Sequence, residues 1–317
     1  MLLVPSSPSW SNENEKTLTT PYHYLADQTQ GKHLRSLLIR TFNLVLNVPA
    51  EKLEKIEAVI DTLHLSSLLI DDIEDNSKLR RSRPCAHMIF GVPQTINCAN
   101  YMYFVAMRLL TDAIENEDKR LAAQNIFLDE MTNLHRGQGL DLHWRENNEC
   151  PSEKEYVNMV MNKTGGLFRL SAKLMNLLAD QPCDKLIALS NMLGVIYQIK
   201  DDYMNLISNV YNKNKGYCED ITEGKFSFPI IHSINANPTN RELQRILKLR
   251  TEEHELKLHA LNIMKSTNSF EYCREALRDL ENQAREVIAE VTQDPAIRIK
   301  LTSTLARVSS LDAENNS

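Results

Sequence analysis

Glycine is scarce in this chain of 317 residues, with 9 copies, or about 3% against about 7% in typical globular proteins. Few glycines leave few positions for tight turns. This argues against a sandwich or barrel of many short strands and against a glycine-rich dinucleotide-binding fold. No apolar run approaches the roughly 18 residues of a membrane-spanning helix, so no membrane span is expected. The composition favours long helices.

An excess of positive charge is also missing, because 36 Lys+Arg face 42 Asp+Glu and give a net charge of −6. Nucleic-acid-binding domains normally carry a positive excess, so no nucleic-acid partner is expected. The six cysteines form no Cys-x-x-Cys pair and have no histidine at zinc-finger spacing. They are typical of reduced thiols, and together with the lack of a convincing signal peptide they predict a cytoplasmic protein.

The chain is organised as one central domain with polar ends. Residues 1–20 are rich in Ser, Asn, Glu and Pro and are predicted to be disordered, and residues 310–317 are predicted to form a C-terminal tail. Over residues 21–309, apolar side chains recur at helical spacing, strand-like alternation is nearly absent, and neither a linker nor a repeat is found. We therefore predict an all-α, single-domain helical bundle.

One of the apolar stripes includes Ile56, Ile60 and Leu63, which recur at helical spacing and are expected to face the interior. Breaks between helices are expected where proline or glycine interrupts the pattern, at residues 48–49, 91–93 and 150–151.

An apolar helical segment ends in an acidic cluster at residues 71–75. Asp71 and Asp75 lie one helical turn apart on the same face, where like charges repel. Either solvation at a helix end or a divalent cation could offset the repulsion, and this cluster alone leaves both interpretations open. Carboxylate oxygens suit Mg²⁺, which usually binds one or two of them together with water and substrate phosphate oxygens.

A second apolar segment also ends in acid, and this repetition favours the metal-binding interpretation. Its polar side chains recur at i, i+3, i+4 and i+7 and share one helix face: Gln198, Asp201, Asp202 and Asn205. Two such helix ends facing across a cavity could hold metal ions that anchor a diphosphate. Arginine forks and lysine point charges suit phosphate oxygens, and the candidate cations are Lys32, Arg35, Arg80, Arg81, Lys163, Lys215 and Lys225.

These motifs resemble those of the short-chain trans-isoprenyl diphosphate synthases, and most of all the fungal geranylgeranyl diphosphate synthases. The segments that carry the resemblance are LLIDDIEDNSKLRR, YQIKDDYMNL, KTGGLF, HRGQGLDLHWR and CEDITEGKFSFPIIH. The resemblance implies a bundle around a deep central cavity and a homodimer or an assembly of dimers. It also implies head-to-tail condensation of isopentenyl diphosphate with an allylic diphosphate (dimethylallyl, geranyl or farnesyl), with about three Mg²⁺ ions per site.

The resemblance also implies roles for individual residues. The metal ligands would be Asp71, Asp75 and Asp201, with Asp72 and Asp202 behind them. The allylic diphosphate would be bound by Arg80, Lys163, Thr164, Gln198, Lys215 and Lys225. Isopentenyl diphosphate would be bound by Gly31, Lys32, Arg35, His64 and Arg81. The residues expected to act in catalysis are Asp71, Asp75, Asp201, Arg80, Lys163 and Lys225.

Product length is expected to follow the depth of the cavity. Ser67 and Ser66 lie four and five residues before Asp71, and their small side chains would let a growing tail pass. Synthases that stop at fifteen carbons typically carry bulky aromatic residues there, so the resemblance implies a twenty-carbon product. Deeper residues that match the floor of the family's twenty-carbon enzymes are Tyr103, Phe104 and His135.

The chain departs from the family pattern at Ser82, where a glycine usually follows the arginine pair, and at Lys200, where arginine is common. These differences raise the hypothesis of a paralogue that supplies a specialised diterpenoid pathway. Two other function classes stay open, a terpene synthase that ionises a single allylic diphosphate and a non-catalytic prenyltransferase subunit. The isopentenyl-binding residues argue against the first class, and the intact acidic clusters argue against the second.

Overall fold

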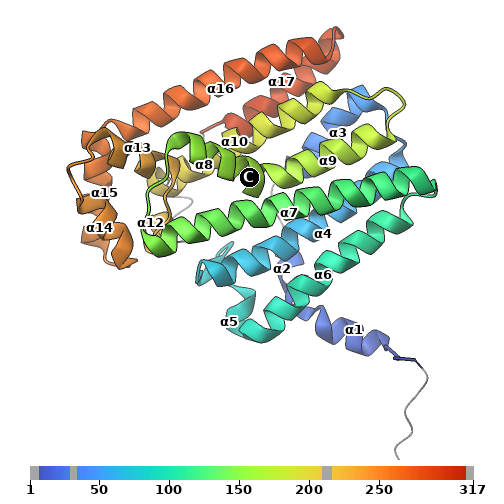
Figure 1. The fold of residues 1–317 in the computed structure, drawn as a ribbon, viewed down its shortest axis with the longest axis horizontal. Helices are drawn as coiled ribbons and strands as arrows, with labels where there is room; N and C mark the ends of the chain where they lie inside the picture. Colours follow the sequence, from blue (N-terminus) through green and yellow to red (C-terminus); the bar gives the residue numbers. More distant parts are fainter. Residues whose placement is uncertain (1–6, 29–33, 209–215, 312–317) are drawn as a thin grey trace, which may run out of the picture.

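The computed structural model describes residues 7–28, 34–208 and 216–311. Within these ranges the chain forms sixteen helices and one two-stranded hairpin (Figure 1). The elements are α1 (Asn12–Leu18), α2 (Thr20–Ala26), α3 (Leu34–Leu46), α4 (Ala50–Glu74), β1 (Leu79–Arg80), β2 (Arg83–Pro84), α5 (Ala86–Phe90), α6 (Val92–Asp112), α7 (Glu117–Asn147), α8 (Glu153–Lys163), α9 (Gly165–Leu178), α10 (Asp184–Ile207), α12 (Glu219–Glu223), α13 (Phe228–Ala236), α14 (Glu242–Leu249), α15 (His254–Ser266), α16 (Ser269–Val291) and α17 (Pro295–Ser309). The predicted all-α class is confirmed.

The long helices form one bundle, in which α4 packs against α6 and α9, and α10 packs against α9 and α16. In Figure 1, α7 crosses the middle of the molecule, with α16 and α17 along its upper edge. Apolar residues at helical spacing give α4 a buried stripe that includes Ile56, Ile60 and Leu63, each with at most 2% of its surface exposed. Burial of these stripes in a shared interior holds the helices together.

Several helix boundaries follow from local sequence. Pro49 stands directly before α4, and Gly91 separates α5 from α6 with φ of +82°, a conformation that glycine adopts without strain. Ser152 begins α8 with a capping box, in which its side chain and that of Glu155 each bind the other residue's backbone N–H. These boundaries agree with the breaks expected from the sequence.

The first acidic helix, α4, is followed by the hairpin of β1 and β2, which carries the arginine pair. The two turn residues, Arg81 and Ser82, have φ of 53° and 62°, so both lie in the left-handed region that favours glycine. Glycine, which the family pattern has at this position, would therefore suit the backbone conformation of residue 82 better than serine does.

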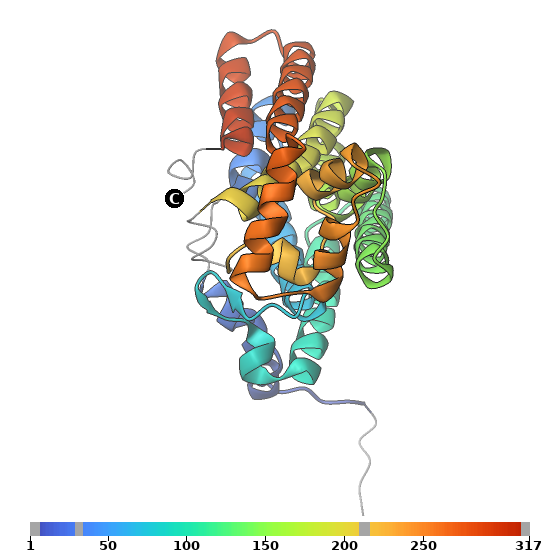
Figure 2. The same ribbon diagram turned by 90° about the vertical axis from the view of Figure 1, so that its left-hand side faces the viewer.

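The N-terminal segment corrects one expectation, because residues 12–18 within the segment predicted to be disordered form α1. Ser11 caps this helix, and Glu15 accepts hydrogen bonds from the side chains of Trp10 and Tyr101. The helix lies at the edge of the molecule, beyond α2 and α6 (Figures 1 and 2). A polar composition alone did not reveal these local anchors.

The last helix, α17, is tied to the second acidic helix. Lys200 of α10 is buried and donates hydrogen bonds to the carbonyl oxygens of Val308 at 3.0 Å and Arg307 at 3.4 Å. A cation in this position satisfies carbonyls in the last turn of a helix, which have no partner within the helix.

Among the described residues, no helix combines the length and apolarity that a membrane crossing requires.

Candidate active site

The first acidic cluster lies at the C-terminal end of α4, beside the hairpin. Asp72 is buried and accepts hydrogen bonds from Arg80, one from Nε at 2.8 Å and a second from Nη2. The same guanidinium lies 3.4 Å from Asp71. Asp72 thus fixes Arg80 in place, whereas Asp71 and Asp75 line the neighbouring pocket.

The second acidic cluster lies near the C-terminal end of α10. Asp202 has no exposed surface and accepts four hydrogen bonds, from Tyr156 Oη (2.6 Å), Gln198 Nε2 (2.8 Å), Lys225 Nζ (2.9 Å) and the Phe228 backbone N–H (2.9 Å). Gln198 accepts a hydrogen bond from Thr164, at the junction of α8 and α9. Asp202 therefore orients Gln198 and Lys225, two of the expected diphosphate-binding residues.

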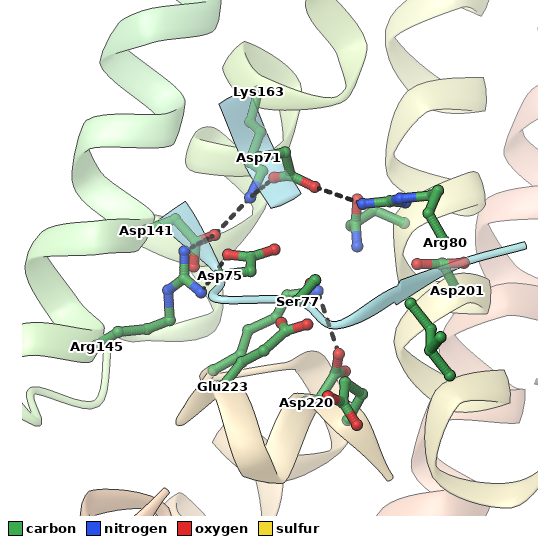
Figure 3. Close-up of a pocket in the computed structure, with 14 residues that line it drawn as sticks. Asp71, Asp75, Ser77, Arg80, Asp141, Arg145, Lys163, Asp201, Asp220 and Glu223 are labelled. Carbon is green, nitrogen blue, oxygen red and sulfur yellow. Dashed lines mark hydrogen bonds and ion pairs between the residues drawn. The ribbon is translucent and has the colours of Figure 1, made fainter. Parts of the chain in front are cut away.

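Both acidic helix ends face one pocket of about 590 Å³, a volume that includes its open mouth. Figure 3 shows Asp201 on one side of this pocket and Asp75 across from it. The lining residues are Asp71, Asp75, Ser77, Leu79, Arg80, Asp141, Arg145, Lys163, Gln198, Asp201, Glu219, Asp220, Glu223 and Lys225. The two clusters that the sequence places 126 positions apart, between Asp75 and Asp201, thus share a single space.

Helix α7 supplies two pocket residues that sequence analysis did not identify. Asp141 is buried and accepts a hydrogen bond from Lys163 Nζ at 2.6 Å, and Arg145 binds Asp75 at 2.6 Å. Gly137 allows the close approach, because a Cβ at this position would lie 2.4 Å from the Lys163 backbone nitrogen. The signal for both residues was the quoted segment HRGQGLDLHWR, in which Asp141 and Arg145 are one helical turn apart.

The short helix α12 adds Glu219, Asp220 and Glu223 to the pocket, and these carboxylates were also not identified from the sequence. In Figure 3, Asp220 and Glu223 lie below the two acidic helix ends. Lys225, just after this helix, lies 3.7 Å from Asp220. These three carboxylates and Lys225 all belong to CEDITEGKFSFPIIH, one of the segments that carry the family resemblance.

The charges in the pocket perturb one another. Burial and the nearby Asp71 raise the pKa of Asp75 above its ordinary value, against the opposing effect of Arg145. Burial disfavours the charged form of Lys163, but Asp141, Asp71 and Asp75 outweigh this effect and raise its pKa. Lys163 is therefore a cation at neutral pH, held among carboxylates that repel one another.

The donor set fits the Mg²⁺ that the resemblance implies, because Asp71, Asp75 and Asp201 offer hard oxygen ligands from two facing helices. A divalent cation between Asp71 and Asp75 would also relieve their repulsion, which adds to burial in raising the pKa of Asp75. In the described part of the chain, no three acidic, histidine or cysteine side chains are grouped closely enough to hold a metal ion. Arg80, Lys163 and Arg145 instead pair with Asp71 and Asp75.

A second group of basic side chains lies next to the first acidic helix. Arg35 and Arg81 each have a buried guanidinium nitrogen, Nε and Nη1 respectively, with no hydrogen-bond partner among the described residues. Burial and the positive charges of Arg35, Arg80 and Arg81 lower the pKa of His64 well below its ordinary value. Arg35 Nε lies 4.0 Å from Asp61 Oδ1, beyond hydrogen-bond distance, so each of the two nitrogens can still donate to an anion. Gly31 and Lys32, expected at the same site, lie outside the described residues, as does Lys215.

The residues expected to set product length differ in their environments. Ser66 is buried, Ser67 is half-buried, and both hydroxyls donate to backbone carbonyls of their own helix. Tyr103 is half-buried and contacts the ring of His135, but His135 is exposed and Phe104 is 72% exposed. In a single chain, Phe104 therefore lies on the outer face of α6 rather than in the interior, which differs from the expected position on the cavity floor.

Comparison with known proteins agrees with this site. The family model for polyprenyl synthetase matches residues 15–264. A geranylgeranyl pyrophosphate synthase of Metarhizium anisopliae is 51% identical over 277 residues, which cover 87% of this chain and 82% of that protein. Enzymes of the same name from Macrophomina phaseolina and Fusarium fujikuroi are each 51% identical, over 88% and 90% of this chain and 84% and 67% of their own lengths. The chain belongs to the polyprenyl synthetase family.

Proposed function

We propose that this protein is a Mg²⁺-dependent geranylgeranyl diphosphate synthase. The observation that carries the proposal is the single pocket lined by Asp71 and Asp75 from α4 and by Asp201 from α10, with Arg80, Lys163 and Lys225 beside them. The names of the similar fungal proteins support the same activity. The substrates are isopentenyl diphosphate and an allylic diphosphate, which is dimethylallyl, geranyl or farnesyl diphosphate.

In the proposed reaction, the bond between C1 and oxygen of the allylic diphosphate breaks and leaves an allylic cation and pyrophosphate. The alkene of isopentenyl diphosphate attacks this carbon, and a proton then passes from the new chain to the departing pyrophosphate. When bound by Asp71, Asp75 and Asp201, Mg²⁺, expected as about three ions, would stabilise the charge that develops on the leaving group. The reaction also requires that apolar helix faces exclude water from the allylic cation, which water would otherwise quench.

The cations of the pocket are proposed to bind and orient the allylic diphosphate. Arg80, held by Asp72, offers a guanidinium fork, while Lys163 and Lys225 offer point charges. Thr164 and Gln198, which bind each other at 2.6 Å, complete this set. Lys215, which lies outside the described residues, is proposed for the same role. The members of this set that the structure describes are held by these hydrogen bonds before the reaction, so little reorganisation of them is needed as negative charge develops.

Isopentenyl diphosphate is proposed to bind at Arg35, His64 and Arg81, together with Gly31 and Lys32. The unsatisfied guanidinium nitrogens of Arg35 and Arg81 support this assignment, because buried donors of this kind call for an anionic partner. The lowered pKa of His64 keeps its imidazole neutral there, so that it can contribute a hydrogen bond rather than a charge. A terpene synthase acting on one substrate would need no such site.

We also propose that two copies of the chain pair through α6 and α7 to form a homodimer, or an assembly of dimers. Large apolar side chains are exposed on these helices: Phe104 is 72% exposed, Leu121 60% and Leu128 55%. A partner that covered α6 would also enclose Phe104, as its proposed place on the cavity floor requires. Multi-angle light scattering should give twice the chain mass or a higher even multiple of it, and Phe104→Arg should shift the protein towards the monomer. The free thiols of all six cysteines, each of which lies within the described ranges, support a cytoplasmic location.

The activity is tested by incubating the purified protein with Mg²⁺, isopentenyl diphosphate and farnesyl diphosphate. Geranylgeranyl diphosphate and pyrophosphate should form, and EDTA should prevent it. Asp75→Asn should lower the rate by at least about 100-fold. Asp279→Asn, which alters an exposed carboxylate on α16, outside the pocket and outside the proposed α6 and α7 interface, should leave the rate unchanged. Cyclisation of farnesyl diphosphate alone would indicate a terpene synthase, and inactivity would indicate a non-catalytic subunit.

A further inference from the structure

Arg145 lies between two carboxylates of the pocket, Asp141 on its own helix and Asp75 at the C-terminal cap of α4. Its Nη1 donates to Asp75 Oδ1 at 2.6 Å, and its Nη2 lies 3.7 Å from Asp141 Oδ2, beyond hydrogen-bond distance. Only 3% of the side chain is exposed. Among the described residues, Nε and Nη2 have no hydrogen-bond partner although both are buried. This guanidinium therefore uses few of its donors and depends on Asp75 for its shortest contact.

Asp75 is also expected to bind a metal ion, so Arg145 and that ion compete for the same carboxylate. Both act on it electrostatically, and the divalent ion carries twice the charge. When the ion binds Asp75, Arg145 need not leave the pocket. Asp141 lies one helical turn away on α7 and can accept hydrogen bonds from the guanidinium nitrogens that have no partner. The contacts thus provide a second position for the guanidinium.

We propose that Arg145 is a positioning residue that neutralises Asp75 before the divalent cation binds and is displaced from it when the cation arrives. This inference rests on the proposed function, because it takes Asp75 to be a ligand of the catalytic ions. Arg145 therefore lowers the affinity of the substrate-free enzyme for Mg²⁺. Metal ions would accordingly bind mainly together with a diphosphate, whose negative charge offsets the competition.

The test is a titration of the substrate-free protein with Mn²⁺, followed by electron paramagnetic resonance of the unbound ion. Arg145→Gln removes the competing charge, and Mn²⁺ should bind on the order of tenfold more tightly than to the wild type. Arg250→Gln is the matched control, since Arg250 pairs with Glu146, neither residue lines the pocket, and the Arg250 side chain is 46% exposed. This variant should bind Mn²⁺ like the wild type. A residue with a purely structural role would change the affinity in the opposite direction, because its loss would disturb Asp75.

Arg145→Lys keeps the charge, but its ammonium can pair closely with only one of the two carboxylates at a time. It should bind Mn²⁺ with an affinity between those of the wild type and Arg145→Gln, and it provides the measurement if the glutamine variant does not fold. Unchanged or weaker Mn²⁺ binding in the Arg145 variants would overturn the inference. If the wild type elongates farnesyl diphosphate in that case, the proposed function stands. If the Arg145 variants bind Mn²⁺ more tightly but the wild type does not elongate farnesyl diphosphate, only the proposed function is overturned.

Discussion

Tyr156 of α8 donates its hydroxyl to Asp202 of α10 across 2.6 Å, and both side chains are buried. The opposite oxygen of the same carboxylate accepts hydrogen bonds from Lys225 and Gln198, which line the pocket. Asp202 is thus fixed from the interior by Tyr156 and in turn holds two groups that face the substrate. This arrangement explains why a second aspartate follows Asp201 although it does not line the pocket.

Tyr156→Phe should lower the free energy of unfolding by about 1.5–3 kcal/mol, because it removes a buried hydrogen bond to a charged group. Urea denaturation measures the change. Tyr101→Phe is the control, since Tyr101 binds Glu15 in a more exposed setting and its loss should cost less than about 1 kcal/mol. Equal losses in the two variants would show that the Asp202 contact has no special weight.

Ser82→Gly should stabilise the protein by up to about 1 kcal/mol, because φ of 62° is unfavourable for serine and not for glycine. Thermal unfolding followed by circular dichroism would detect the increase. Ser310→Gly changes the same residue type at φ of −54°, where glycine brings only a loss of backbone entropy. This control should not stabilise the protein, and a Ser82→Gly variant that behaves like it would contradict the explanation.

His64 should make stability depend on pH below about 6.5, the ordinary pKa that it regains on unfolding. Its pKa is depressed in the fold, so the unfolded chain takes up the proton first as the pH falls. The His64 contribution is therefore complete well above pH 6.5 and is lost as the pH falls through this value, by up to about 1.4 kcal/mol between pH 7.5 and 5.5. His64→Gln should remove this share of the pH dependence in urea denaturation at the two pH values. An identical pH dependence in both proteins would refute it.

Ser67→Phe should shift the main product from twenty towards fifteen carbons, because an aromatic ring one turn below Asp71 would block the growing tail. The products formed from dimethylallyl diphosphate and isopentenyl diphosphate can be separated by chromatography after removal of phosphate. Ser67→Ala keeps a small side chain and should retain the twenty-carbon product. An unchanged product profile in Ser67→Phe would rule out cavity depth at this position as the determinant.

The sequence predicted the parts of the fold and site that follow from local pattern. The apolar stripe with Ile56, Ile60 and Leu63 predicted the buried face of α4, and the spacing of Asp71 and Asp75 predicted their common side. Pro49 and Gly91 marked helix boundaries correctly. Such features depend on residues a few positions apart, so helical periodicity and turn preferences are sufficient to find them.

Asp141 and Arg145 could not be found in this way, because their roles depend on contacts with α4 and α8. By sequence they form an acidic and basic pair one turn apart on a polar helix, the usual pattern of a solvent-exposed face. Only the packing of α7 against the end of α8, at Gly137, reveals that both are buried. Phe104 presents the opposite case, since an aromatic residue assigned to the interior lies exposed in the single chain.

The most direct test of the central claim is a crystal structure with Mn²⁺ and a non-hydrolysable bisphosphonate analogue of farnesyl diphosphate. Anomalous scattering locates the Mn²⁺ ions. We predict ions bound to Asp71 and Asp75 on one side and to Asp201 on the other, all in contact with the same bisphosphonate. Ions bound to only one of the two helices, or a bisphosphonate bound outside this pocket, would contradict the account.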